Sequence, residues 1–123
     1  MKFYKCNKCG NIILEINDKC VVSCCGETME LLEANSVDAA SEKHVPVIGV
    51  NGVDITVKCG EVPHPMEEKH YIEFIALETD KGNYVKYLKP GEEALCNFRL
   101  CDGEKVSCAY AYCNLHGLWK SNN

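Results

Sequence analysis

Short apolar segments bounded by turn residues recur along most of the chain, and helical periodicity is nearly absent. The clearest turn is Asn51-Gly52, which separates two β-rich segments and is a strong signal for a two-residue hairpin. Asp102-Gly103 is a second turn, and we expect the segments on either side of it to pair. The pattern predicts an all-β sandwich, with strands at 45–50, 53–59, 71–77, 84–88, 92–100 and 106–112.

The first part of the chain has its own pattern. Ile12–Ile16 and Val21–Ser23 are predicted to be two short strands that turn at Asn17-Asp18. The segment Ser36–Ser41 is small and polar without a clear period, so we place a boundary near residue 36. We therefore expect a small module at 1–35, too short to be stabilised by burial alone, and a β-sandwich domain at 36–123.

Composition limits the partners and the compartment. The net charge is −5 and no basic stripe is present, which argues against a nucleic-acid partner. The N-terminus lacks the pattern of a signal peptide, and nowhere do about 18 apolar residues run together, so we expect a cytoplasmic protein without a membrane partner. In a reducing compartment, the ten cysteines favour metal ligation over disulfides. An extracellular disulfide scaffold is the competing interpretation.

Four cysteines form the first candidate metal site. A Cys-x-x-Cys motif followed by glycine precedes an adjacent cysteine pair, also followed by glycine, and the predicted hairpin at 12–23 would bring the two half-sites together. Iron and zinc both accept tetrahedral sulfur, so these residues alone leave the metal open. The adjacent pair differs from common zinc ribbons, which keep two residues between both pairs. The four residues are Cys6, Cys9, Cys24 and Cys25.

The four histidines and one further cysteine form the second candidate site. The cysteine lies three residues before the last histidine, a spacing that suits two ligands of one metal, and prolines stiffen the two earlier histidine segments. Four imidazoles and one thiolate exceed the four ligands of tetrahedral zinc and suit a square-pyramidal iron with one position open for a substrate. These residues are His44, His64, His70, Cys113 and His116.

The segments that carry these residues, Glu42–Pro46, His64–Ile72 and Cys113–Trp119, resemble the superoxide reductases, and most closely the two-iron desulfoferrodoxins. The resemblance implies an immunoglobulin-like sandwich, a desulforedoxin-type iron centre on the first four cysteines, and a second, ferrous iron. It implies one-electron reduction of superoxide to hydrogen peroxide at that second iron, a rubredoxin-like external electron donor, and a homodimer.

The same resemblance gives roles to individual residues. Lys43 would attract the anionic substrate and aid its protonation, and Glu42 would cap the open position in the ferric state. Cys113 would be the axial ligand of the second iron. The equatorial ligands would be His44, His64, His70 and His116.

Two other functions stay open at this point. The chain could transfer electrons through both irons without turning over superoxide, or it could be a structural zinc protein. The remaining cysteines are interpreted as small buried hydrophobic residues, and one pair, Cys96 with Cys108, could lie within bridging distance. These remaining cysteines are Cys20, Cys59, Cys96, Cys101 and Cys108.

Overall fold

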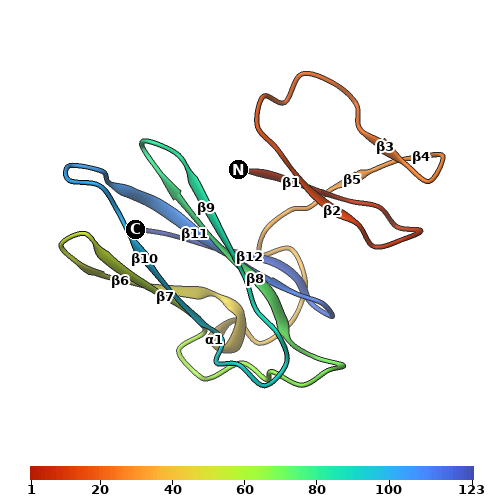
Figure 1. Cartoon of the computed structure of the whole chain (residues 1–123). Coiled ribbons are helices and arrows are strands. Elements are labelled where there is room, and N and C mark those ends of the chain that lie inside the picture. The colour runs from red at the N-terminus through yellow and green to blue at the C-terminus, as the bar shows by residue number, and fades with distance from the viewer. The chain divides into compact units, whose positions relative to one another are not determined.

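The structure, a computed structural model, describes all residues from 1 to 123 and forms two compact units, Met1–Glu33 and Ala34–Asn123 (Figure 1). Nearly all regular structure is strand, which confirms the all-β prediction. The one helix, α1, spans Ser41–His44, and no helix is long and apolar enough to cross a membrane. The strands are β1 Lys2–Lys5, β2 Ile12–Glu15, β3 Ser23–Cys24, β4 Glu27–Thr28, β5 Glu30–Leu31, β6 Pro46–Asn51, β7 Asp54–Cys59, β8 Ile72–Thr79, β9 Asn83–Tyr87, β10 Leu95–Arg99, β11 Val106–Cys113 and β12 Gly117–Asn122.

In the first unit, β1 lies between β2 and β5 in a three-stranded antiparallel sheet. The chain turns between β1 and β2 at the Cys-x-x-Cys motif, where Gly10 donates to the Cys6 carbonyl and Cys6 donates to the Asn11 carbonyl, both at 2.9 Å. The expected pairing of Ile12–Ile16 with Val21–Ser23 is therefore wrong. Because the cysteine motif itself is the turn, β2 pairs with the strand before that motif.

The adjacent cysteine pair lies in a second turn, between β3 and β4. Cys24 pairs with Glu27, so Cys25 and Gly26 are the two residues of the hairpin loop. Both have positive φ, 53° and 77°, as a type I′ turn requires. Glycine adopts this conformation without strain. The adjacent cysteines are thus explained by one tight turn that presents two neighbouring sulfurs.

The second unit contains two antiparallel sheets, with strand orders β10-β7-β6 and β12-β11-β8-β9. The predicted hairpin between β6 and β7 is confirmed, with Asn51 paired to Asp54 and Gly52 at φ 63°. The inner faces of the two sheets share one core. On β11 this core uses the small side chains of Ala109 and Ala111, which pair with Leu77 and Ile75 of β8. Each small residue of β11 thus lies beside a large residue of β8 in the same sheet, which helps to fill the core without gaps.

Two strand predictions in this unit are wrong. The segment before Asp102-Gly103 pairs with β7, and β11 instead pairs with β8 and β12, so residues 100–105 cross from one sheet to the other. The last strand, β12, was not predicted. A bulge between Val106 and Cys108 also changes the alternation of β11, because Val106 packs on the core whereas Cys108 is outside it.

The topology gathers four chain segments at one end of the second unit. The start of β6 lies beside the end of β7, since Pro46 pairs with Cys59. The start of β8 lies beside the end of β11, since Ile72 pairs with Cys113. Each histidine segment adjoins one of these strand ends, so the sequence-distant histidines meet there.

Candidate metal centres

The first centre is a cluster of four cysteine sulfurs in the first unit. The Sγ atoms of Cys6, Cys9, Cys24 and Cys25 all lie within 4.8 Å of one another. Cys9 Sγ lies 3.7 Å from Cys24 Sγ, which in turn lies 3.8 Å from Cys25 Sγ. The Cys9 backbone N–H points to Cys6 Sγ at 3.5 Å. The structure thus brings together all four cysteines that the sequence indicated.

The protonation of these sulfurs favours a bound cation. Backbone N–H groups of Cys9 and Lys8 lower the pKa of Cys6 to about 6, so this sulfur is a thiolate at neutral pH. Hydrogen bonds to the Cys6, Cys9 and Cys25 sulfurs raise the pKa of Cys24 to about 12, because they stabilise its protonated form. A metal cation displaces that proton and makes all four thiolates available as ligands.

The second centre forms at the gathered strand ends. His44 is the last residue of α1, His64 and His70 belong to the connection between β7 and β8, and Cys113 with His116 lies at the turn between β11 and β12. One nitrogen each from His44, His70 and His116 lies within 4.8 Å of the others and of Cys113 Sγ. His64 completes the group, because its Nε2 is 3.1 Å from His44 Nε2.

Backbone carbonyls select the nitrogens that face this cluster. His44 Nδ1 lies 2.7 Å from the Ala40 carbonyl and His64 Nδ1 lies 2.6 Å from the Pro65 carbonyl, so both Nδ1 atoms donate a proton. The Nε2 atoms of these two rings are then unprotonated and face each other. Two lone pairs at 3.1 Å repel one another, and a cation bound by both nitrogens would remove this repulsion.

The remaining ligand candidates fit the same interpretation. His70 Nε2 is buried and has no hydrogen-bond partner, the state expected of a metal-ligating nitrogen. His116 turns its Nδ1 toward the cluster, 3.1 Å from His44 Nε2 and 3.8 Å from Cys113 Sγ. Four nitrogens and one sulfur therefore converge, a donor set that fits a redox-active transition metal such as iron.

Burial keeps three of the histidines neutral and ready to bind. It lowers the pKa of His64 to about 4 and also lowers the pKa of His44 and His70, to which the neighbouring His116 contributes. Burial raises the pKa of Cys113, while the backbone N–H groups of Leu115 and His116 act in the opposite direction. Those two N–H groups can stabilise the thiolate once a metal has displaced its proton.

Glu42 and Lys43 lie exposed on α1, beside the buried His44. The positive charge of Lys43 contributes to the lowered pKa of His70, and the negative charge of Glu42 opposes the lowering at His44. Both charges therefore act on the histidine cluster. The turn that carries them precedes β6 directly, and its backbone is held by the segment that follows β7.

That supporting segment approaches α1 very closely at Gly60. A Cβ atom at Gly60 would lie 2.5 Å from the Lys43 carbonyl oxygen, and Gly60 has φ 81°. Its N–H donates to the Val45 carbonyl at 3.1 Å, and the Val62 N–H donates to the Glu42 carbonyl at 3.0 Å. The Cys59 thiol adds a contact of 3.3 Å to the His44 carbonyl. Only glycine fits at position 60.

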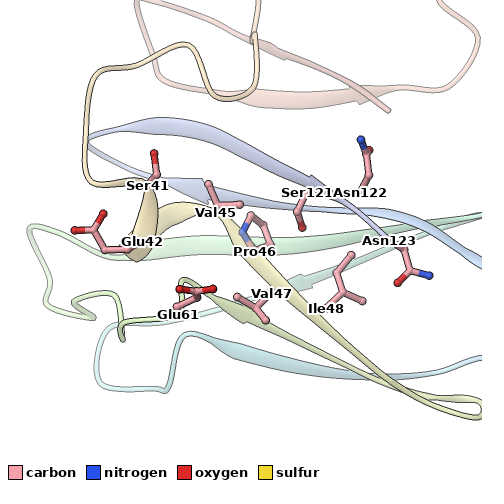
Figure 2. A pocket seen from close by; sticks show the side chains of 10 residues that line it. All are labelled: Ser41, Glu42, Val45, Pro46, Val47, Ile48, Glu61, Ser121, Asn122 and Asn123. Atoms are coloured by element: carbon pink, nitrogen blue, oxygen red, sulfur yellow. The ribbon is translucent and has the colours of Figure 1, made fainter.

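A hollow of about 610 Å³ lies beside the same turn (Figure 2). None of the four histidines lines it, so it is separate from the second centre. Glu42 and Glu61 lie at one end of the hollow, and Asn122 and Asn123 lie at the other. Its other lining residues are Ser41, Val45, Pro46, Val47, Ile48 and Ser121.

Residues 36–122 match the protein-family model described as Desulfoferrodoxin. The chain belongs to the desulfoferrodoxin family. A desulfoferrodoxin of Desulfarculus baarsii is 47% identical over 124 residues, covering 100% of this chain and 97% of that relative. The crystal structure of a superoxide reductase from Treponema pallidum is similar over 98% of both chains, with a TM-score of 0.84 and 35% identity. The structure of a 1Fe superoxide reductase from Giardia intestinalis is also similar, with a TM-score of 0.57 and 42% identity, and the match covers 67% of this chain and 97% of that chain.

The desulfoferrodoxin resemblance seen in the sequence is thereby confirmed, but sequence reasoning missed four supporting residues. Asn114 and Trp119 lie inside the last ligand segment, and Trp119 stacks on the His44 ring at 4.8 Å while its indole N–H donates to the His116 carbonyl. Cys59 is buried as expected, yet it also supports α1, and Gly60 directly after a strand was the available signal for a close approach.

The other cysteines divide into two groups. Cys96 and Cys108 are buried, like Cys59, which confirms their packing role. Cys20 and Cys101 are exposed, so their interpretation as buried residues is wrong. Both lie in loops outside the sheets, where no core is available to cover them. None of the ten cysteines forms a disulfide, and this includes Cys96 and Cys108.

Proposed function

We propose that this chain is a superoxide reductase that converts superoxide to hydrogen peroxide by one-electron reduction at an iron centre in the domain 36–123. The supporting observation is the convergence of unprotonated ring nitrogens on one thiol, including a buried His70 nitrogen without a partner. Family membership and the superoxide reductase structures of similar fold support the same activity.

The proposed ligands are those that the sequence indicated. Cys113 is the thiolate ligand of the catalytic iron, and its nitrogen ligands are His44, His64, His70 and His116. The module 1–35 holds a second iron on Cys6, Cys9, Cys24 and Cys25. These five residues would hold a ferrous iron, which would supply the one electron that superoxide needs and could accept superoxide as a further ligand.

The residues around this position manage charge and protons. Superoxide must gain one electron and two protons to leave as hydrogen peroxide. Lys43 attracts the anion and aids its protonation, since its charge already reaches the His70 ring. The N–H groups of Leu115 and His116 hold negative charge on Cys113. Glu42, on the same turn as Lys43, covers the open position between turnovers.

The first module suits a different task. Four thiolates complete a tetrahedral site and leave no position for a substrate, so this iron can exchange electrons only. We propose that, with iron bound, this module would pass electrons from a rubredoxin-like donor to the catalytic centre. The ten free thiols fit a reducing, cytoplasmic compartment, and a homodimer is the proposed assembly.

The decisive experiment mixes the reduced, iron-loaded chain with a pulse of superoxide and measures the products. Reduction yields hydrogen peroxide without oxygen, whereas dismutation yields both. Cys113→Ser should keep an imidazole-bound metal and lose the reaction, because a hard oxygen cannot replace the thiolate donor. An iron-loaded parent that does not react with superoxide would instead be an electron-transfer protein. A colourless parent that contains zinc would be a structural protein.

A further inference from the structure

His64 and His70 are the ligand candidates in the long connection between β7 and β8, and the ring of His70, unlike that of His64, makes no hydrogen bond to the backbone. His44 ends α1 and stacks on Trp119, and His116 shares a tight turn with Cys113. His70 lies in the long connection between β7 and β8, and it is less buried than His44 or His64. Its Nε2 has no hydrogen bond that could orient the ring. Something other than a strand must hold its backbone in place.

The side chain of Asn114 holds the peptide groups on both sides of His70. Its Nδ2 donates to the Lys69 carbonyl at 3.0 Å, and its Oδ1 accepts from the Tyr71 N–H at 3.0 Å. The Asn114 backbone N–H also donates to the Tyr71 carbonyl, at 3.2 Å. In an extended chain, the carbonyl before a residue and the N–H after it point to the same side. One side-chain amide therefore replaces the neighbouring strand on that side.

Glu67 occupies the opposite side of the same segment. The His70 N–H donates to the Glu67 carbonyl and the Glu67 N–H donates to the His70 carbonyl, both at 3.0 Å. The backbone on both sides of His70 is thus paired, although the residue lies outside every strand. The ring is the only part of His70 left without a hydrogen bond.

We infer that Asn114 is a positioning residue that fixes His70 against the turn of Cys113 and His116. Asn114 follows the thiolate candidate directly in sequence, so one residue couples the sulfur ligand to the ligand from the separate loop. A displacement of that loop would otherwise move one nitrogen away from the other four donors. This inference rests on the proposed ligand set, because it concerns how that set is held.

The chain offers a matched control for Asn114. Asn35 makes a comparable pair of amide hydrogen bonds, both with one residue, from Nδ2 to the Lys120 carbonyl at 3.1 Å and from the Lys120 N–H to Oδ1 at 2.9 Å. Lys120 is not a ligand candidate. Because Asn35 has φ 61°, its amide is best removed by Asn35→Gly, which adds no backbone strain. Asn114→Ala removes the amide at the test position.

The experiment uses the full, iron-loaded chain and follows the release of each iron to a chelator. Partners that orient metal ligands typically change metal affinity by about 10- to 100-fold when they are replaced. We expect Asn114→Ala to release the histidine-bound iron at least about tenfold faster, to alter the absorption of the thiolate–iron centre, and to leave the four-cysteine iron unchanged. Hydrogen exchange in the peptide that contains His70 and Tyr71 should accelerate in parallel.

Asn114→Asp is the second variant, since it keeps the acceptor for the Tyr71 N–H but loses the donor to Lys69. It should release the same iron faster than the parent, and it tests the inference if Asn114→Ala does not fold. Asn35→Gly should match the parent in iron release and in absorption. The inference would be overturned if the Asn114 variants released iron and absorbed light as the parent does. It would also be overturned if Asn35→Gly changed iron release and absorption as much as the Asn114 variants do. A parent without iron at this centre would instead overturn the proposed function.

Discussion

At the scale of single residues, hydrogen bonds on the outer side of two histidine rings decide which of their nitrogens face the metal. The Ala40 and Pro65 carbonyls accept protons from His44 and His64, which leaves the opposite nitrogens unprotonated. Such outer contacts fix both the tautomer and the direction of a ligand. The histidine cluster is therefore arranged for a cation before any metal binds, which reduces the ordering that binding requires.

Lys43 provides a prediction at this scale because the substrate and the whole chain carry charge of the same sign. The net charge is −5, so superoxide approaches against an unfavourable field unless a local positive charge attracts it. Lys43→Ala should slow the bimolecular reaction about tenfold and weaken its dependence on ionic strength, since electrostatic steering is of this order. Lys43→Arg should preserve much of both. Pulse radiolysis across a salt series measures these rates.

The matched control removes an equal charge far from the centre. Lys105 is exposed just before β11, whose eight residues span about 27 Å to Cys113. The screening length is about 10 Å at 0.1 M salt, so Lys105→Ala should leave the rate unchanged. Equal rates for Lys43→Ala and the parent would mean that Lys43 is an ordinary solvated charge.

At the scale of elements, the single turn of α1 depends on contacts with the segment that follows β7. α1 has only four residues, too few to be stable by itself. The segment after β7 supplies its support, with N–H groups donated to the Glu42 and Val45 carbonyls and the Cys59 thiol against the His44 carbonyl. Gly60 permits this contact because it lacks a side chain.

Gly60→Ala should therefore destabilise the chain and weaken iron binding at the histidine centre. Gly103 gives the comparison, because it has the same φ of 81° but nothing within 4 Å of its Cβ position. Gly103→Ala should cost about 1–2 kcal/mol from backbone strain alone. Gly60→Ala should cost roughly 1–3 kcal/mol more, since the Lys43 carbonyl must move. Thermal unfolding and iron content check both values, and equal losses in the two variants would refute the proposed support.

The elements also show what the sequence could and could not predict. The hairpin at Asn51-Gly52 was predictable from its turn residues. The two groups of metal ligands were predictable from the spacing of the cysteines and histidines. Strand partners were less predictable, because β10 and β11 are adjacent in sequence yet belong to different sheets. The role of Asn114 was not predictable, since one of its amide partners lies 45 residues away.

At the scale of the whole molecule, two different metal chemistries occupy two compact units of one chain. The family model matches residues 36–122, and the 1Fe reductase of Giardia intestinalis covers 67% of this chain. These matches fit the proposed division of labour, in which the larger unit performs catalysis and the first module handles electrons. The two centres should then lose metal independently of each other.

Cys9→Ser tests this independence. The variant should contain about one iron per chain where the parent contains two, because a serine oxygen does not replace a soft thiolate in a tetrahedral sulfur site. With an artificial reductant that reaches the catalytic iron directly, its reduction of superoxide should match the parent. With a rubredoxin-like donor, turnover should slow, since the proposed relay is missing. Cys20→Ser is the control, because Cys20 is exposed and lies outside the sulfur cluster, so it should keep both irons and both rates. If Cys9→Ser lost superoxide reduction with the artificial reductant while keeping its histidine-bound iron, the first centre would be required for the reaction itself.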